Sequence, residues 1–148
     1  GNGVKKLSVD GTTYDVTTLS VGNPHCVTFV DFVDKLDLKT LGPKFEHHKV
    51  FPERTNTEFV RVVGPNELKM RTWERGNGET PACGTGACAV AVASIMLGNA
   101  GKRNQPLTVI AKGGTLQVTY MRNETVYLEG PAVEAFTGVV DVPDEVVK

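Results

Sequence analysis

One stretch decides the fold of this chain: Gly84 to Leu97, which reads GTGACAVAVASIML. We expect a helix over this stretch, because its residues are small or apolar on every side and Gly98-Asn99 follows as a helix stop. A helix that has no polar face must be buried. The remainder of the chain is therefore expected to wrap around it.

The sequence on both sides of this stretch is typical of β-strands. Short β-branched or alternating runs are separated by turn residues such as Asp10-Gly11 and Gly113-Gly114. We predict an α+β fold, a curved and mostly antiparallel sheet wrapped around a central buried helix. The expected strands are Val4 to Val9, Tyr14 to Val21, Cys26 to Asp31, Thr57 to Val63, Glu67 to Glu74, Leu107 to Lys112, Thr115 to Met121, Thr125 to Glu129 and Val133 to Val140.

A second helix is expected shortly after the third of these strands. Leu38, Leu41 and Phe45 recur at helical spacing, and Asp37 stands where an N-cap residue would be. Pro43 lacks a backbone N–H and should limit this helix to a turn or two.

The composition restricts the kind of partner. The 148 residues include 16 Lys and Arg against 17 Asp and Glu, for a net charge of −1. This balance argues against nucleic acid and against an anionic membrane surface, so we expect a small-molecule partner. The length suits one domain or half of a two-lobed protein. Three cysteines without disulfide spacing, and the absence of a long apolar run, indicate free thiols in a cytoplasmic protein.

Cys83 is the candidate reactive group, because it falls at the N-terminus of the expected buried helix. Helix N–H groups and the positive end of the helix dipole favour the thiolate there and can also hold a carboxylate. Gly84 and Gly86 remove side chains beside it, so a ligand could approach the backbone. Cys88 lies about 140° further around the helix, and we expect it to pack in the apolar wall.

Nucleotide and metal sites find no support in the sequence. The glycine-rich segment around Gly76 and Gly78 matches neither the P-loop nor the dinucleotide-binding pattern. Metal is not expected, because the candidate ligands have no paired ligand spacing. These candidates are His25, Cys26, His47, His48, Cys83 and Cys88.

Three motifs together resemble the diaminopimelate epimerase family. They are Gly22-Asn23-Pro24-His25-Cys26, Pro52-Glu53-Arg54-Thr55-Asn56, and a long segment from Trp73 to Ala89 that reads WERGNGETPACGTGACA. Taken singly, the first two could be structural turns. The likeness runs to Leu128-Glu129-Gly130-Pro131-Ala132 and covers the second lobe of the two-lobed family, so residues 1–148 are expected to form a single lobe without the N-terminal one.

The resemblance implies a reaction and roles for individual residues. In the family, LL-diaminopimelate becomes the meso form without pyridoxal phosphate or metal, in the pathway to lysine and peptidoglycan precursors. One cysteine thiolate removes the α-proton and a second thiol, from the first lobe, returns one. By this likeness Cys83 is one of the pair, with Glu74 and His25 tuning the two thiols. Asn23, Asn56 and Arg75 would hold the distal end of the substrate, and the backbone at Gly84 and Thr85 its α-carboxylate.

Other functions remain open from the sequence. A related racemase or phenazine-biosynthesis-type isomerase could share the fold, although the set Asn23, Asn56 and Arg75 argues for a substrate with a distal end. The chain alone could be an incomplete binding or dimerisation lobe, since one base cannot complete two-base chemistry, and we expect a homodimer. A hydrolase that uses Cys83 and His25 has only the residue types in its favour.

Overall fold

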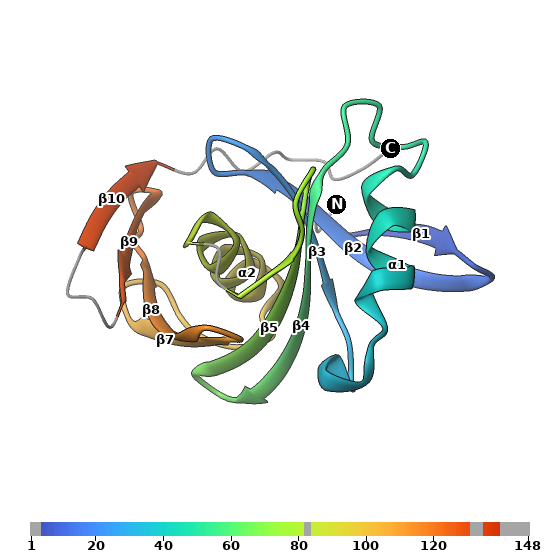
Figure 1. Ribbon diagram of the computed structural model, residues 1–148. Helices are drawn as coiled ribbons and strands as arrows, with labels where there is room; N and C mark the ends of the chain where they lie inside the picture. Colours follow the sequence, from blue (N-terminus) through green and yellow to red (C-terminus); the bar gives the residue numbers. More distant parts are fainter. Residues whose placement is uncertain (1–3, 82–83, 131–134, 140–148) are drawn as a thin grey trace.

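The computed structural model describes residues 4–81, 84–130 and 135–139 (Figure 1). Among these residues the structure has ten strands, two α-helices and one short 3-10 helix. In chain order the elements are β1 (Lys5–Val9), β2 (Thr12–Ser20), β3 (Pro24–Phe29), η1 (Val33–Lys35), α1 (Leu38–Glu46), β4 (Asn56–Gly64), β5 (Glu67–Glu74), β6 (Gly78–Thr80), α2 (Gly84–Leu97), β7 (Pro106–Ala111), β8 (Gly114–Tyr120), β9 (Thr125–Glu129) and β10 (Ala135–Val139).

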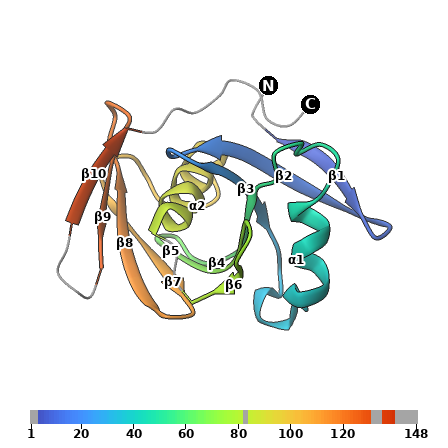
Figure 2. The same cartoon turned by 45° about the horizontal axis from the view of Figure 1, so that its top comes forward.

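The strands form one strongly curved sheet with α2 inside the curve and α1 on the outer side (Figures 1 and 2). The strand order is β1-β2-β3-β4-β5-β7-β8-β9-β10, and β6 pairs with β5. Within the described residues, two neighbouring pairs are parallel, β3 with β4 and β5 with β7, and the others are antiparallel. The predicted fold class is confirmed. The parallel pairs arise because the connections that join them carry α1 and α2.

The buried helix also has the predicted bounds. Every residue from Gly86 to Ser94 is buried, and side chains from most strands surround the helix. Its small residues allow the sheet to close around it. Gly98 ends the helix with a φ of +75°.

No helix of the described residues has the length and apolar character that a membrane span requires.

The helix α1 begins where the sequence predicts but is not limited by Pro43. It runs from Leu38 to Glu46, so Pro43 lies inside it and does not end it. The helix continues past Pro43 because its apolar side is buried. Phe45 is fully buried between the rings of Tyr14 and Phe59, and each ring centroid is 5.1 Å from that of Phe45. Asp37 occupies the N-cap position without a side-chain cap, and its carboxylate accepts from the Thr40 hydroxyl at 2.8 Å.

The predicted strands agree with those observed. β5 and β9 have the expected bounds, and the predicted strands that correspond to β1, β2, β3, β4, β7 and β8 differ from those observed by one or two residues at one or both ends. The part of the last predicted strand before Ala135 lies among residues 131–134, outside the described residues. The three-residue strand β6 was missed, because Gly78 to Thr80 reads as a continuation of the glycine-rich turn.

Candidate functional site

The predicted site residues that the structure describes lie at or next to the ends of β3, β4 and β5 and in the first turn of α2. Side chains of a strand alternate between the two faces of a sheet. Val27 of β3 and Val60 of β4 pack around α2, so His25 and Glu58, each two positions earlier, lie on the same concave face. The parallel register places His25 beside Asn56. Asn23 contacts Thr85 of α2 at 3.5 Å, which ties this group of side chains to the helix N-terminus.

His25 lies at the centre of a buried chain of polar contacts. Its Nδ1 is 2.8 Å from Glu58 Oε1, and its Nε2 is 3.1 Å from Asn23 Oδ1. The side chains of His25 and Glu58 are both completely buried. The prediction named His25 and Asn23 but missed Glu58, because a glutamate within a strand gives no sign of which side chain it will meet across the sheet.

Asn56 joins the ends of two strands. Its amide nitrogen donates to the Pro24 carbonyl at 2.9 Å, and its side-chain oxygen accepts from the Arg75 backbone N–H at 2.8 Å. The Arg75 guanidinium donates to the Glu53 carbonyl at 3.2 Å. The three residues predicted to hold the distal end of a substrate therefore lie in one region, since Asn23 precedes Pro24 directly.

The end of β5 and the turn that follows it carry Glu74 and Arg75, and they are held by a residue that the prediction missed. Glu46, the last residue of α1, is buried and accepts from Trp73 Nε1 at 2.9 Å and from the Gly76 backbone N–H at 3.0 Å. Arg54 donates to the same carboxylate at 3.1 Å. A glutamate near a helix end usually reads as a solvated residue, so only the fold reveals this function.

A second carboxylate fixes the hairpin between β5 and β6. Arg71 makes a two-pronged ion pair with Glu79, with N–O distances of 2.8 and 2.9 Å, and also donates to the carbonyls of Val33 and Leu36. The hydrogen bond from Arg71 lowers the pKa of the Glu79 carboxyl below its usual value. This pairing holds the glycine-rich segment against the outer elements of the fold.

Cys83, the predicted acid/base thiol, lies outside the described residues, which stop at Pro81 and resume at Gly84. Cys26 and Cys88 are both buried. Cys88 packs in the core around α2, as predicted. Burial raises the pKa of the Cys26 thiol far above its usual value, and the charge of Glu58 raises it further, so Cys26 is held as a neutral thiol.

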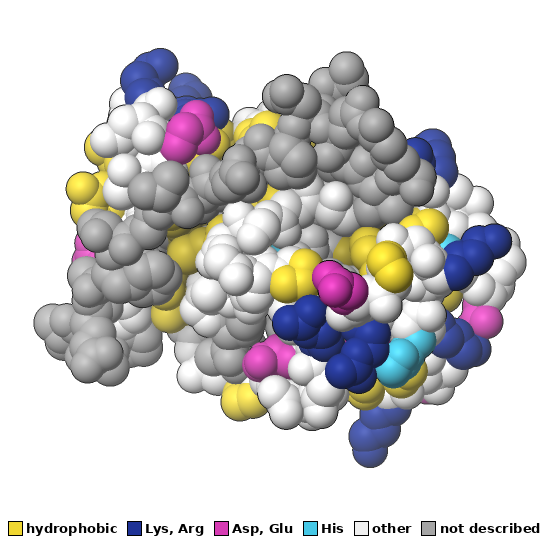
Figure 3. Space-filling model, turned by 90° about the horizontal axis from the view of Figure 1, so that it is seen from above, with side chains coloured by type: hydrophobic (Ala, Val, Ile, Leu, Met, Phe, Trp, Pro, Cys, Tyr) yellow, Lys and Arg dark blue, Asp and Glu magenta, His cyan; other side chains and the backbone are white. Residues whose placement is uncertain are grey.

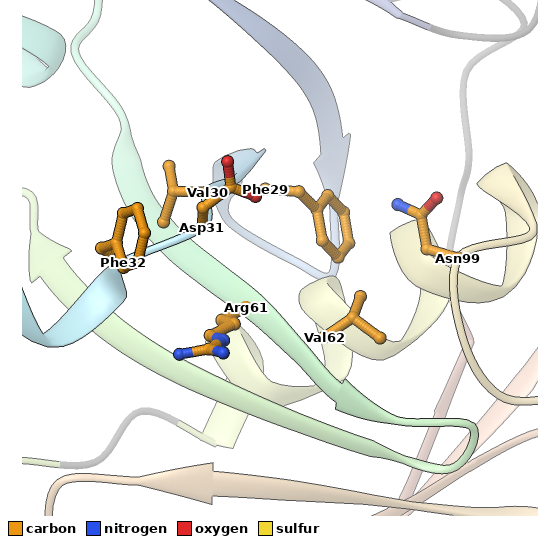
Figure 4. Close-up of a pocket in the computed structure, with 7 residues that line it drawn as sticks. All are labelled: Phe29, Val30, Asp31, Phe32, Arg61, Val62 and Asn99. Atoms are coloured by element: carbon orange, nitrogen blue, oxygen red, sulfur yellow. The ribbon is translucent and has the colours of Figure 1, made fainter.

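A surface pocket of about 490 Å³ lies away from this group of residues (Figure 4). It is bordered by the end of β3, by β4 and by the residues that follow α2, where Asn99 stands. None of the predicted site residues within the described part of the chain lines it. It is close to the C-terminal end of α2, whereas His25 and Asn23 are near its N-terminus, roughly 20 Å away by the rise of a fourteen-residue helix.

One face of the molecule carries charges of both signs. On the face seen from above, basic and acidic side chains lie next to one another in the part that the structure describes (Figure 3). Among the described residues, no group of three or more His, Cys, Asp or Glu side chains could hold a metal ion.

The fold places this chain in a known structural class. Three solved structures share it: a predicted epimerase from Pseudomonas aeruginosa (TM-score 0.53, 17% identity), a phenazine biosynthesis protein from Bacillus anthracis (0.50, 21%) and a putative phenazine biosynthesis protein from Clostridium difficile (0.54, 19%). They cover 75%, 78% and 78% of this chain, and the matches span 40%, 37% and 43% of their own chains. At these identities the likeness concerns the fold.

The sequence defines the family. The model of the family described as diaminopimelate epimerase matches residues 17–134, and this chain belongs to that family. The diaminopimelate epimerase of Acaryochloris marina is 50% identical over 136 residues, 91% of this chain and 47% of that protein. The diaminopimelate epimerase of Microcystis aeruginosa is 51% identical over 137 residues, 92% of this chain and 48% of that protein. The chain thus spans about half the length of these relatives.

Proposed function

We propose that this chain forms one half of the active site of a diaminopimelate epimerase. The observation that carries the proposal is that residues of three separate motifs are linked by hydrogen bonds: Asn23 contacts His25 and Thr85 of α2, and Asn56 joins Pro24 to the Arg75 backbone. Identity of about 50% to proteins named diaminopimelate epimerase supports this activity over that of the more distant isomerases of the same fold.

The reaction is the exchange of a proton at the α-carbon of LL-diaminopimelate. The thiolate of Cys83 removes the α-proton, and a second thiol on the opposite face returns a proton, so that the configuration inverts and no electrons are transferred. The C–H bond becomes acidic only if the developing negative charge is stabilised. The N–H groups at Gly84 and Thr85 are suited to hold the α-carboxylate, because a helix N-terminus carries the positive end of the dipole.

The remaining residues would hold the other end of the substrate and adjust the thiols. Arg75 offers a planar fork to a carboxylate. The amide of Asn56 contacts Pro24 and Arg75, which orients the Arg75 backbone, and each amide atom can make a second hydrogen bond to a ligand. Glu74 would adjust Cys83, and His25 would adjust the second cysteine.

A first lobe would provide that second cysteine. We propose that residues 1–148 correspond to the second of two lobes, with the substrate held between them in a site that excludes water. The protein would act in the cytoplasm as a homodimer, without pyridoxal phosphate or a metal ion.

Proton exchange in D2O tests the proposal. The chain is incubated with LL-diaminopimelate and a thiol reductant, alone and joined to the first half of the Microcystis aeruginosa relative, and the α-proton is followed by NMR. We expect loss of the α-proton signal and meso product with the joined chain, and no exchange after Cys83→Ser. Cys88→Ala is the matched control and should retain exchange. Turnover of proline without turnover of diaminopimelate would contradict the proposal.

A further inference from the structure

Both ring nitrogens of the buried His25 face oxygen atoms. Nδ1 is 2.8 Å from Glu58 Oε1 and Nε2 is 3.1 Å from Asn23 Oδ1. The Asn23 amide is oriented with its nitrogen 3.5 Å from Thr85 Oγ1 and its oxygen toward His25. An amide oxygen can only accept a hydrogen bond, so the Asn23 contact requires a hydrogen on Nε2.

The second contact then requires another hydrogen. With Nε2 protonated and no further proton, the lone pair of Nδ1 would face the Glu58 carboxylate, and two acceptors would stand 2.8 Å apart. With the single proton on Nδ1, the lone pair of Nε2 would face the Asn23 oxygen instead. With the Asn23 oxygen facing His25, both contacts are hydrogen bonds only if one proton lies between Glu58 Oε1 and Nδ1 while Nε2 carries its own.

Burial points to the same arrangement. The side chains of His25 and Glu58 are completely buried, and Glu58 Oε2 has no hydrogen-bond partner among the residues that the structure describes. A carboxylate beside a neutral imidazole would leave an uncompensated negative charge there, which is costly in a dry interior. The additional proton makes the pair neutral as a whole.

We propose that Glu58 is a positioning residue for His25, with one proton held between Glu58 Oε1 and His25 Nδ1, so that Nε2 is a fixed N–H donor directed at Asn23. In the site, His25 is then a hydrogen-bond donor that stabilises a neighbouring anion, such as a thiolate or a carboxylate. It does not act as a proton acceptor. This consequence for catalysis rests on the proposed function, whereas the assignment of the protons rests on the contacts of His25.

Nitrogen-15 NMR of the imidazole rings tests the assignment on the 148-residue chain itself at pH 7. The chain has three histidines, and His25→Gln identifies the His25 signals. We expect a directly observed, slowly exchanging N–H at Nε2 of His25. His48 serves as an internal comparison, since its Nδ1 accepts from the Val50 N–H at 3.2 Å and must be unprotonated in that contact. An Nε2 of His25 without a proton would overturn the proposal.

Two substitutions at position 58 separate positioning from packing. In Glu58→Gln the amide nitrogen can donate to Nδ1, so the Nε2–H signal should be retained. In Glu58→Met the volume is similar but the hydrogen-bonding group is lost, so His25 should show a mixture of tautomers and a weaker Nε2–H signal. Glu67→Gln, at an exposed carboxylate, is the control for a change of charge.

The outcomes decide whether Glu58 positions His25 through a hydrogen bond or only fills space beside it. A Glu58→Met chain with an unchanged His25 spectrum, or a Glu58→Gln chain with a bare Nε2, would contradict the proposal. If Glu58→Met does not fold, the wild-type and Glu58→Gln spectra still decide. Because these spectra require no substrate, failure of the epimerase proposal in the D2O experiment would be seen separately.

Discussion

The backbone of Gly42 in α1 packs directly against the indole ring of Trp73. A Cβ atom at position 42 would stand 2.1 Å from Trp73 Cδ2, well inside van der Waals contact. The absence of a side chain at this position lets α1 approach the end of β5 closely enough for Glu46 to reach Trp73 Nε1 and the Gly76 N–H. The helix on the outer face thereby supports the end of β5 and the turn that follows it, which carry Glu74 and Arg75.

Substitution Gly42→Ala should therefore disturb this support. We expect a loss of about 2 kcal/mol in the free energy of unfolding, because the added methyl group must displace the ring. This corresponds to a fall in Tm of roughly 4–8 °C for a chain of this size. Thermal unfolding measures the loss, and the fluorescence of Trp73, the one tryptophan of the chain, reports the displacement.

Gly64→Ala is the matched control for Gly42→Ala. A Cβ at position 64 would lie 3.8 Å from its nearest neighbour, Glu67 Cβ, which is an ordinary contact. The control should unfold within about 1 °C of wild type. Equal losses in both variants would show that the approach of Gly42 to Trp73 is not what holds α1.

Glu46→Gln tests the carboxylate that supports the turn. One amide oxygen cannot serve Trp73, Gly76 and Arg54 together, and the new amide N–H groups would face donors. We expect a loss of about 1–3 kcal/mol in stability and a shift of the Trp73 indole N–H signal in NMR. In the joined chain, kcat/KM for diaminopimelate should fall because Arg75 loses its position. An unchanged indole signal would contradict this function of Glu46.

Asn56→Asp separates the two contacts of the amide. The carboxylate can still accept from the Arg75 N–H but can no longer donate to the Pro24 carbonyl. We expect Asn56→Asp to retain more of the Arg75 geometry than Asn56→Ala, and so to lose less activity. The measurement is KM for diaminopimelate in the two variants. Equal KM values would argue against the backbone of Arg75 as the group that Asn56 orients.

The Arg71–Glu79 pair predicts a dependence of stability on pH. The pKa of Glu79 is lower in the folded chain than its usual value of 4.5, mainly because Arg71 donates a hydrogen bond to it. The pair therefore stabilises the fold above pH 4.5, and this contribution is lost as the pH falls through the folded pKa. Glu79→Gln should cost about 1–2 kcal/mol at pH 7, with a difference from wild type that shrinks below pH 4. Urea unfolding at several pH values measures it.

Tyr120 should make the stability of the fold depend on pH in the alkaline range. Burial, together with its hydrogen bond to Glu124, raises the pKa of Tyr120 to about 12 from the usual 10. The unfolded chain ionises first, so the contribution of this tyrosine is present below pH 10 and is lost between pH 10 and 12. Unfolding of Tyr120→Phe should depend less on pH in this range than that of wild type. Identical pH dependence would contradict the assignment.

The sequence alone determined the elements of this fold that have strong local patterns. Gly84 to Leu97 is apolar throughout, so its burial follows from the hydrophobic effect alone. The bounds of β5 follow from its alternation and from the Gly64-Pro65-Asn66 turn before it. The motifs around His25, Asn56 and Glu74 were also recognisable, because their residue types and order resemble those of a known family.

Only the tertiary structure decided which side chains meet. Glu46 and Glu58 are ordinary glutamates in the sequence, and each became a buried hydrogen-bond partner through the crossing of elements far apart along the chain. Pro43 likewise stays within α1 because the burial of Phe45 outweighs the lost backbone hydrogen bond. Such contacts depend on the register and packing of the whole sheet, and no local pattern encodes them.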